Sequence, residues 1–202
     1  MEPVNYHSDG NMAVFNAPVS VNGNLNVGKS IDFSLTDIID VFQEVSSDLQ
    51  NLNNCFFDDL HIENPIVDRI TSWIDQNSEN PKDRLAVITG DAGQGKSVVM
   101  RDIFEKVSKK ENICVLALKA DILSLENDKD FKDQYDCPVS LQKCINTIAA
   151  KSEKFILLVD QLDALSLSLS SNRKALTYYN RLINHVMCLP NAKVVISCRL
   201  YD

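Results

Sequence analysis

The sequence contains the pattern G-x-x-x-x-G-K-S twice, and residues in this pattern can bind phosphate. The first copy is GNLNVGKS at residues 23–30, and the second is GDAGQGKS at residues 90–97. In such a loop the glycines let successive backbone N–H groups curl around phosphate oxygens, and the lysine adds a mobile positive charge. The loop must connect a buried strand to a helix, because the helix N-terminus supplies further positive potential. The flanking residues therefore decide between the two copies.

The second copy has the flanking elements that phosphate binding requires. The apolar run LAVIT, residues 85–89, precedes it as a strand that we expect to be buried on both faces, and residues 98–107 follow as a helix. The first copy lies in a β-hairpin predicted near residues 18–28, where Asn-Gly is a strong turn signal. We therefore assign nucleotide phosphate binding to the second copy. The candidate nucleotide-binding residues are those of this copy and the residue after it: Gly90, Asp91, Ala92, Gly93, Gln94, Gly95, Lys96, Ser97 and Val98.

A strand that ends in an aspartate is the second element able to do chemistry. Residues 155–159 are apolar, and Asp160 follows them. In this Walker B arrangement the aspartate carboxylate and the Ser97 hydroxyl meet Mg²⁺, while Lys96 reaches the β and γ phosphates of a nucleotide. We therefore predict Ser97 and Asp160 as metal-binding residues, with ATP and Mg²⁺ as the cofactors.

Two further charged residues are candidate catalytic groups. Arg199 follows the apolar run at residues 194–196, and Asp163 comes three residues after Asp160. Phosphates bind at the carboxyl edge of such a sheet, where both residues are expected. Arg199 either senses the γ phosphate or forms a surface ion pair. Asp163 orients the attacking water, or helps to bind the metal, or caps a helix or loop.

The elements that must position these residues alternate between strands and helices from residue 84 onwards. Such alternation predicts a parallel sheet with helices on both faces, which is an α/β fold of three layers. The expected strands are 85–89, 113–118, 155–159 and 193–197. The expected helices are 98–107, 139–150 and 173–187, with a short helix within the loop 121–136 and a mobile loop at 165–171.

Two more helices are predicted ahead of the loop. Apolar residues three or four apart indicate a helix over residues 36–52 with Thr36 as its N-cap. Asn64 and Pro65 begin a second helix that runs to about Gln76, before a polar connector at 77–81. We divide the chain into an N-terminal hairpin and helix extension, residues 1–60, and a nucleotide-binding domain, residues 61–202.

The composition excludes several other classes of protein. The 202 residues are 45% hydrophobic and 24% charged, as in ordinary globular domains. A net charge of −8 disfavours nucleic acid as a partner. No apolar run approaches the roughly 20 residues of a membrane helix, and the acidic N-terminus lacks a signal-peptide pattern. The six cysteines form no C-x-x-C pair, so a zinc site is not expected and a cytoplasmic location is the simplest one.

Together GDAGQGKS, LLVDQLDAL and VVISCR resemble the STAND class of P-loop NTPases, and its NACHT-type branch in particular, over roughly residues 60–202. The resemblance implies an ATP-binding switch of a larger signalling or defence protein, whose nucleotide state selects between compact and assembled forms. It implies that Arg199 reads the γ phosphate and that residues 61–69 help to cover the adenine base. It also implies that the strand at 193–197 lies between those at 85–89 and 155–159.

The sequence departs from the NACHT pattern after Asp160. Walker B segments of that branch usually read D-G-[LF]-D-E, whereas Gln161 replaces the glycine and Ala164 the final glutamate. AAA+ ATPases carry a glutamate directly after the first aspartate, and neutral Gln161 cannot accept a proton. We therefore expect Mg-ATP binding with slow or absent hydrolysis. An AAA+-like motor and a non-catalytic interaction module with a vestigial nucleotide site remain the alternatives.

The class also implies a fifth strand and a helical lid, which we do not find before residue 202. We therefore expect a domain truncated at its C-terminus, with the strand at 85–89 as an exposed edge. Exposed apolar edges favour association. The expected partners are accordingly a nucleotide and either a second copy of the chain or the remainder of a longer one, with no membrane.

Overall fold

The computed structural model describes residues 7–9, 12–14, 33–53, 55–56, 60–61, 63–166 and 172–200. The chain divides into two units, Met1–Phe33 and Ser34–Asp202. In the first unit β1 (His7–Asp9) pairs antiparallel with β2 (Met12–Val14). The hairpin predicted at 18–28 and the first copy of the phosphate-loop pattern lie outside the described residues.

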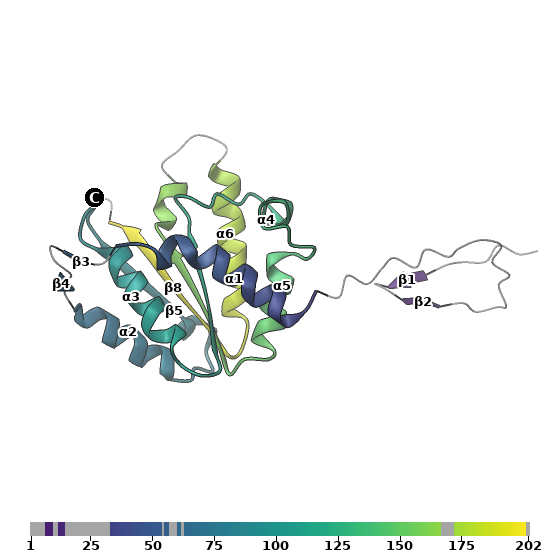
Figure 1. The fold of residues 1–202 in the computed structure, drawn as a ribbon, viewed down its shortest axis with the longest axis horizontal. Helices are drawn as coiled ribbons and strands as arrows, with labels where there is room; N and C mark the ends of the chain where they lie inside the picture. Colours follow the sequence, from purple (N-terminus) through teal and green to yellow (C-terminus); the bar gives the residue numbers. More distant parts are fainter. Residues whose placement is uncertain are drawn as a thin grey trace, which may run out of the picture. The chain divides into compact units, whose positions relative to one another are not determined.

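A four-stranded parallel sheet organises the second unit (Figure 1). Its strands are β5 (Leu85–Gly90), β6 (Ile113–Lys119), β7 (Lys154–Asp160) and β8 (Ala192–Arg199). The order across the sheet is β5-β8-β7-β6, so the last strand lies between the first and the third, as expected. This order and the loop after β5 confirm an α/β P-loop NTPase fold.

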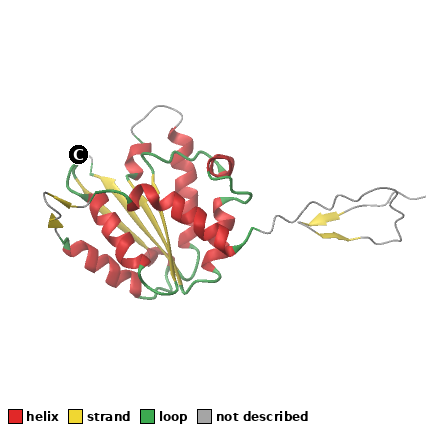
Figure 2. Cartoon of the chain, viewed as in Figure 1, coloured by secondary structure: helices red, strands yellow, loops and turns green. Residues whose placement is uncertain are grey.

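Helices cover both faces of this sheet (Figure 2). On one face α1, α2 and α3 share a core with β-strand residues such as Ile88, Ile156 and Val195. On the other face α5 contacts β7 and α6 contacts β8. Phe155, near the start of β7, is buried, and its ring centre lies 6.1 Å from that of Phe42 on α1. The helices are α1 (Leu35–Gln50), α2 (Pro65–Asp75), α3 (Lys96–Ser108), α4 (Asp128–Gln134), α5 (Leu141–Ala149) and α6 (Asn172–Met187).

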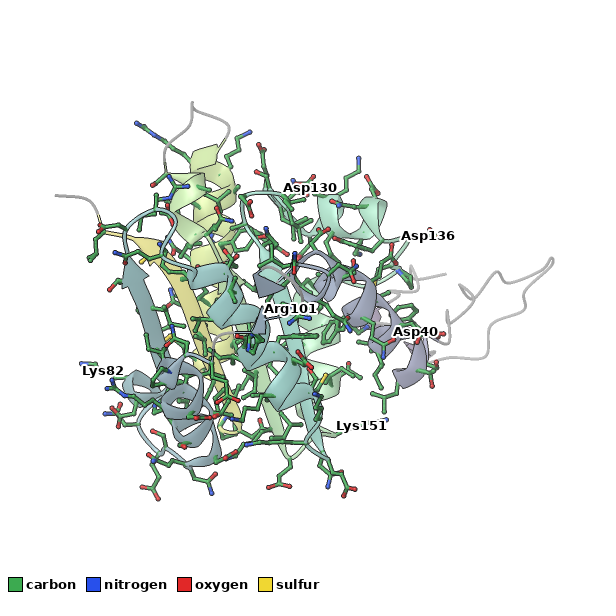
Figure 3. All side chains as sticks on the ribbon, turned by 60° about the vertical axis from the view of Figure 1, so that its left-hand side comes forward. Asp40, Lys82, Arg101, Asp130, Asp136 and Lys151 are labelled. Atoms are coloured by element: carbon green, nitrogen blue, oxygen red, sulfur yellow. The ribbon has the colours of Figure 1, made fainter. Side chains whose placement is uncertain are left out.

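Short elements complete the second unit. Two-residue strands β3 (Cys55–Phe56) and β4 (Leu60–His61) pair antiparallel between α1 and α2. Single 3-10 turns cover Pro81–Arg84 and Leu162–Leu165. Charged side chains such as Asp40, Lys82 and Lys151 lie on the outside (Figure 3). Within the described ranges no helix is long and apolar enough to cross a membrane.

The N-cap of α1 is Ser34, so the prediction of Thr36 was wrong. Ser34 Oγ accepts the Asp37 N–H at 3.2 Å, and Asp37 Oδ2 accepts the Ser34 N–H at 2.7 Å. These two reciprocal bonds form a capping box, which needs the acidic side chain three residues after the cap. The position of Asp37 therefore selects Ser34 as the cap.

The two edges of the sheet differ in their cover. α1 packs along β6, where Ser46 Oγ accepts the Ala117 N–H at 3.0 Å. In contrast, β8 is the only strand that pairs with β5 within the described part of the chain, and the Val87 side chain is 51% exposed. The expectation that residues 85–89 are buried on both faces was therefore wrong. The domain division at residue 60 stays a prediction, although α1 packs within the second unit.

Candidate functional site

The phosphate-loop pattern at residues 90–97 connects β5 directly to α3. Gly93 and Gly95 have φ angles of 79° and 74°, a left-handed conformation that glycine adopts without a steric cost. Gly95 is also the N-cap of α3 and offers no side chain to its first N–H groups. These donors, together with the partial positive charge of the helix end, are therefore available to an anion.

The Lys96 ammonium lies against the loop that precedes it. Lys96 Nζ donates to the carbonyl oxygens of Gly90 at 2.8 Å and Asp91 at 2.7 Å. Gln94 closes the same loop, because its Oε1 accepts the Asp91 N–H at 3.0 Å and its Nε2 donates to Asp91 Oδ2 at 3.1 Å. An ammonium has three N–H donors, so these two bonds position the cation and leave one donor for a phosphate.

Asp160 ends β7 and is completely buried. Its Oδ1 accepts the Ser197 hydroxyl at 2.5 Å, and the same hydroxyl oxygen accepts the Gln161 N–H at 2.9 Å. Its Oδ2 is also buried and has no hydrogen-bond partner. Leaving a buried polar atom unpaired costs about 1–3 kcal/mol, and more for a charged group. This orphaned oxygen therefore points to a ligand, and a hard divalent cation such as Mg²⁺ fits it.

Sequence reasoning missed the role of Ser197. Ser197 was given no role from the sequence and was not connected to Asp160, which lies 37 positions earlier. A serine that is fully buried within a strand needs a hydrogen-bond partner, and this requirement was the available signal.

Asp163 and Arg199 contact each other. The Arg199 backbone N–H donates to Asp163 Oδ1 at 3.1 Å, and Arg199 Nε lies 3.4 Å from Asp163 Oδ2. The 3-10 turn after β7 has Gln161 as its N-cap, so Asp163 does not cap it. Cys198 is adjacent, and burial raises the pKa of its thiol; the Asp163 carboxylate also raises it, against a smaller lowering by Lys96.

A cavity of about 350 Å³ brings most of the predicted site residues together. Gly90, Asp91, Gln94 and Asp160 are not part of its lining, although Asp91 and Gln94 shape the loop. The lining includes two residues that the sequence analysis did not consider, Leu52 and Asn53, which follow α1. The lining residues are Leu52, Asn53, Ala92, Gly93, Gly95, Lys96, Ser97, Val98, Gln161, Asp163 and Arg199.

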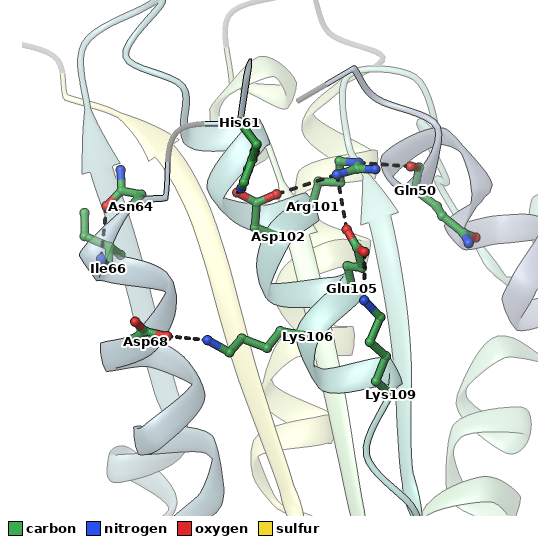
Figure 4. A network of polar contacts seen from close by, with 10 residues as sticks. All are labelled: Gln50, His61, Asn64, Ile66, Asp68, Arg101, Asp102, Glu105, Lys106 and Lys109. Carbon is green, nitrogen blue, oxygen red and sulfur yellow. Dashed lines mark hydrogen bonds and ion pairs between the residues drawn. The ribbon is translucent and has the colours of Figure 1, made fainter. Parts of the chain in front are cut away.

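The segment expected to cover the adenine base lines a different cavity. His61, Asn64, Val67 and Asp68 border a space of about 520 Å³ between α2 and α3, away from the phosphate loop. Figure 4 shows the charged side chains around it. His61 Nε2 lies 3.4 Å from Asp102 Oδ2 on α3, so this part of the chain connects β4 to α3.

Among the described residues, no group of three or more His, Cys, Asp or Glu side chains could hold a metal ion. Mg²⁺ does not require such a cluster, because it binds through one or two protein oxygens together with phosphates and waters. Asp160 and Ser97 are of the right chemical type.

No known protein family matches the chain by its family model, and no curated protein matches it in sequence. Among solved structures, the chain is similar to PCH-2 of C. elegans with 18% identity and a TM-score of 0.46, over 78% of this chain and 42% of that one. It is similar to a chain of the HORMA:CdnC:Trip13 complex of E. coli MS115-1 with 17% identity and a TM-score of 0.44, over 79% and 59%. A Walker-type ATPase of Pyrococcus abyssi follows with 15% identity and a TM-score of 0.41, over 74% and 48%.

The chain spans only about half the length of the structures that it matches, between 42% and 59%. Similarity at this level carries no argument about activity. The P-loop NTPase fold rests instead on the strand order and on the loop between β5 and α3.

Proposed function

We propose that the chain binds Mg-ATP in the cavity at the carboxyl edge of the sheet and serves as the switch module of a STAND- or NACHT-like signalling or defence NTPase. The observation that carries the proposal is the buried, unpartnered Oδ2 of Asp160. It lies at the end of β7, at the sheet edge where the glycine loop after β5 presents Lys96 and the N-terminus of α3.

Ser97 and Asp160 would hold the metal. Both supply oxygen ligands, and Ser97 lies in the first turn of α3. Bound Mg²⁺ would neutralise negative charge on the β and γ phosphates. Lys96, already positioned by the loop carbonyls, adds its remaining donor to the same phosphates.

Asp163 and Arg199 would act at the γ phosphate. Their mutual contact uses the backbone N–H and Nε of Arg199, so its two terminal nitrogens can still reach a phosphate. Asp163 would orient the attacking water. Gln161 is neutral, and its Nε2 donates to Asp121 Oδ2 at 3.1 Å. This site has no glutamate after Asp160, and we therefore propose slow hydrolysis, which suits a switch whose ATP state must persist.

Calorimetric titration with ATP, with and without Mg²⁺, tests the binding. Lys96→Ala should weaken ATP binding by about 100-fold or more, because it removes the cation aimed at the phosphates. Lys29→Ala, in the other copy of the pattern, is the matched control and should leave the affinity unchanged. Equal losses in both variants would show that the choice between the loops is wrong. No binding to the unmutated chain would favour the non-catalytic interaction module.

Steady-state phosphate release separates the switch from the AAA+-like motor. A switch should hold ATP with little turnover, whereas a motor should hydrolyse it rapidly. Fast release by the unmutated chain would therefore favour the motor.

We also propose that the outer edge of β5 is paired in the functional assembly, by a second copy or by the remainder of a longer chain. The exposed Val87 supports this proposal, because apolar strand edges favour association. Sedimentation analysis should show self-association that Val87→Lys reduces, since a charge at the edge opposes pairing. A monodisperse monomer at high concentration would contradict association between copies.

A further inference from the structure

Arg101 connects two helices beside the candidate pocket. It lies on α3, which follows the phosphate loop, and it contacts the end of α1, which is followed by the pocket residues Leu52 and Asn53. Arg101 comes one turn after Ser97, and its Nε donates to the carbonyl oxygen of Gln50 at 3.2 Å (Figure 4). Its Nη1 lies 3.6 Å from Asp102 Oδ1 and 3.3 Å from Glu105 Oε2 (Figure 4). The Arg101 side chain is only 21% exposed, so these neighbours hold it in place.

This contact supplies a charge that α1 lacks. Gln50 is the last residue of α1, and the last turn of that helix contains no basic residue. The final carbonyl groups of a helix have no partner within it and carry a partial negative charge. Arg101 therefore satisfies one of these carbonyls and compensates the helix end from a neighbouring element.

The end of α1 determines the position of the two residues that follow its cap and line the pocket, Leu52 and Asn53. Asn51 caps the helix, and the Leu52 N–H donates to the Leu49 carbonyl at 3.2 Å. Leu52 and Asn53 then border the candidate nucleotide cavity together with Val98. Phosphates need hydrogen-bond donors and cations, which the loop provides. The aliphatic surface of Leu52 and Val98 instead suits the base or the ribose of a nucleotide.

We propose that Arg101 is a positioning residue for the nucleoside part of a nucleoside triphosphate. By holding the C-terminus of α1, it places Leu52 and Asn53 as the wall that contacts base and ribose, while the phosphate subsite stays independent of it. This inference rests on the proposed nucleotide binding.

Comparing ATP with inorganic tripolyphosphate tests the inference, because tripolyphosphate has no nucleoside. Each ligand is titrated with Mg²⁺ into the unmutated chain and its variants. Arg101→Met should weaken ATP binding about fivefold to tenfold, as for the net loss of one ordinary hydrogen bond, and leave tripolyphosphate affinity within about twofold. Arg101→Lys keeps a cation at the end of α1 and should retain most of the ATP affinity. Lys109 is the other cation that pairs with Glu105, and among the described residues its ammonium has no hydrogen bond to α1. Lys109→Gln is therefore the control and should change the affinity for neither ligand.

Leu52→Ser tests the wall without disturbing the contact between α1 and α3. It should lower the affinity for ATP but not that for tripolyphosphate. If thermal unfolding shows that Arg101→Met does not fold, the result for Leu52→Ser tests the inference in its place. Equal losses for ATP and tripolyphosphate, or an unchanged ATP affinity in Leu52→Ser and in a folded Arg101→Met, would overturn the inference. If the unmutated chain binds neither ligand, the proposed function itself is wrong. Normal ATP binding with no selective loss overturns the role of Arg101 and Leu52 alone.

Discussion

Buried or half-buried charged side chains lie at both ends of the parallel sheet, but their polar atoms are satisfied in different ways. At the amino end, Arg84, Lys154 and Lys193 donate to carbonyl groups near the ends of helices. At the carboxyl end, Asp160 keeps one buried oxygen without a partner. A ligand at the carboxyl end could therefore supply a missing partner to Asp160, whereas the cations at the amino end already have partners.

Arg84, at the amino end of the sheet, has all its side-chain nitrogens in hydrogen bonds to backbone carbonyls. Its guanidinium donates to the carbonyl oxygens of Met187, the last residue of α6, and of Leu189, at 3.0 and 3.1 Å. It also donates to the carbonyls of Ser78 and Glu79, over 3.0 to 3.2 Å. Each nitrogen of the guanidinium donates a hydrogen bond to the protein, so this cation connects chain segments and has no donor left for a ligand.

The other two cations, Lys154 and Lys193, donate hydrogen bonds to the last carbonyl groups of α2. Lys154 Nζ donates to the Ile74 carbonyl at 3.0 Å and also to that of Asp75. Lys193 Nζ donates to the Trp73 carbonyl and lies 4.2 Å from the centre of the Trp73 ring. All three cations line a cavity of about 590 Å³, which is larger than the candidate nucleotide cavity of about 350 Å³. Cavity size therefore does not select the proposed nucleotide site, and the proposal rests on the unpaired oxygen of Asp160 instead.

The largest effect on stability is expected at the amino end. Arg84→Ala leaves four carbonyl groups without their donor and should lower the free energy of unfolding by about 3–5 kcal/mol. Urea denaturation measures this change. Lys82→Ala, an exposed position in the same 3-10 turn, is the control and should change stability by no more than about 0.5 kcal/mol. A loss below about 1 kcal/mol in Arg84→Ala would contradict the structural role of this end.

The opposite pattern is expected for Asp160→Asn. This change keeps the Ser197 contact but removes the charge, so Mg²⁺-dependent ATP affinity should fall at least about tenfold, or roughly 1.4 kcal/mol. Its free energy of unfolding should be no lower than that of the unmutated chain, because a neutral amide is cheaper to bury than an unpaired carboxylate oxygen. Calorimetric titration and urea denaturation on the same samples measure both quantities. A marked loss of stability would make Asp160 a structural residue.

Lys193 should produce a pH dependence of stability. Burial, helped by the charge of Lys154, lowers the pKa of Lys193 from 10.5 to about 8. Between pH 8 and pH 10.5 the unfolded chain thus binds a proton that the folded chain does not, and stability rises with pH across this window. Relative to Lys193→Met, the unmutated chain should gain about 2 kcal/mol between these limits. Denaturation of both proteins at several pH values measures the difference, and a flat difference would contradict the lowered pKa.

The smallest effect on binding is expected for Asp163→Asn. An asparagine can still accept the Arg199 N–H, so ATP affinity should stay within about twofold. Any steady-state phosphate release should disappear, because the charged acceptor that orients the attacking water is lost. Turnover that survives this change would remove Asp163 from the proposed mechanism and leave its contact with Arg199 as its role.

Local sequence was sufficient for features that depend on neighbouring residues. The loop at 90–97 was predictable because Gly93 and Gly95 allow a left-handed backbone between an apolar strand and a helix. The start of α2 was predictable for the same kind of reason, since Asn64 and Pro65 form a cap and a first turn by themselves. The Asn64 Oδ1 accepts the Ile66 N–H at 3.0 Å, two residues away.

Only the tertiary structure decided the contacts between distant segments. Arg199 meets Asp163 across 36 residues, and Arg101 meets Gln50 across 51, and neither pair leaves a pattern in the local sequence. The exposure of Val87 likewise depends on which strands lie beside β5 and not on its apolar neighbours in sequence. Hydrophobic periodicity records which residues are buried, but a specific polar contact requires two chain segments to be placed to within the length of a hydrogen bond. That precision comes from the packing of helices onto the sheet.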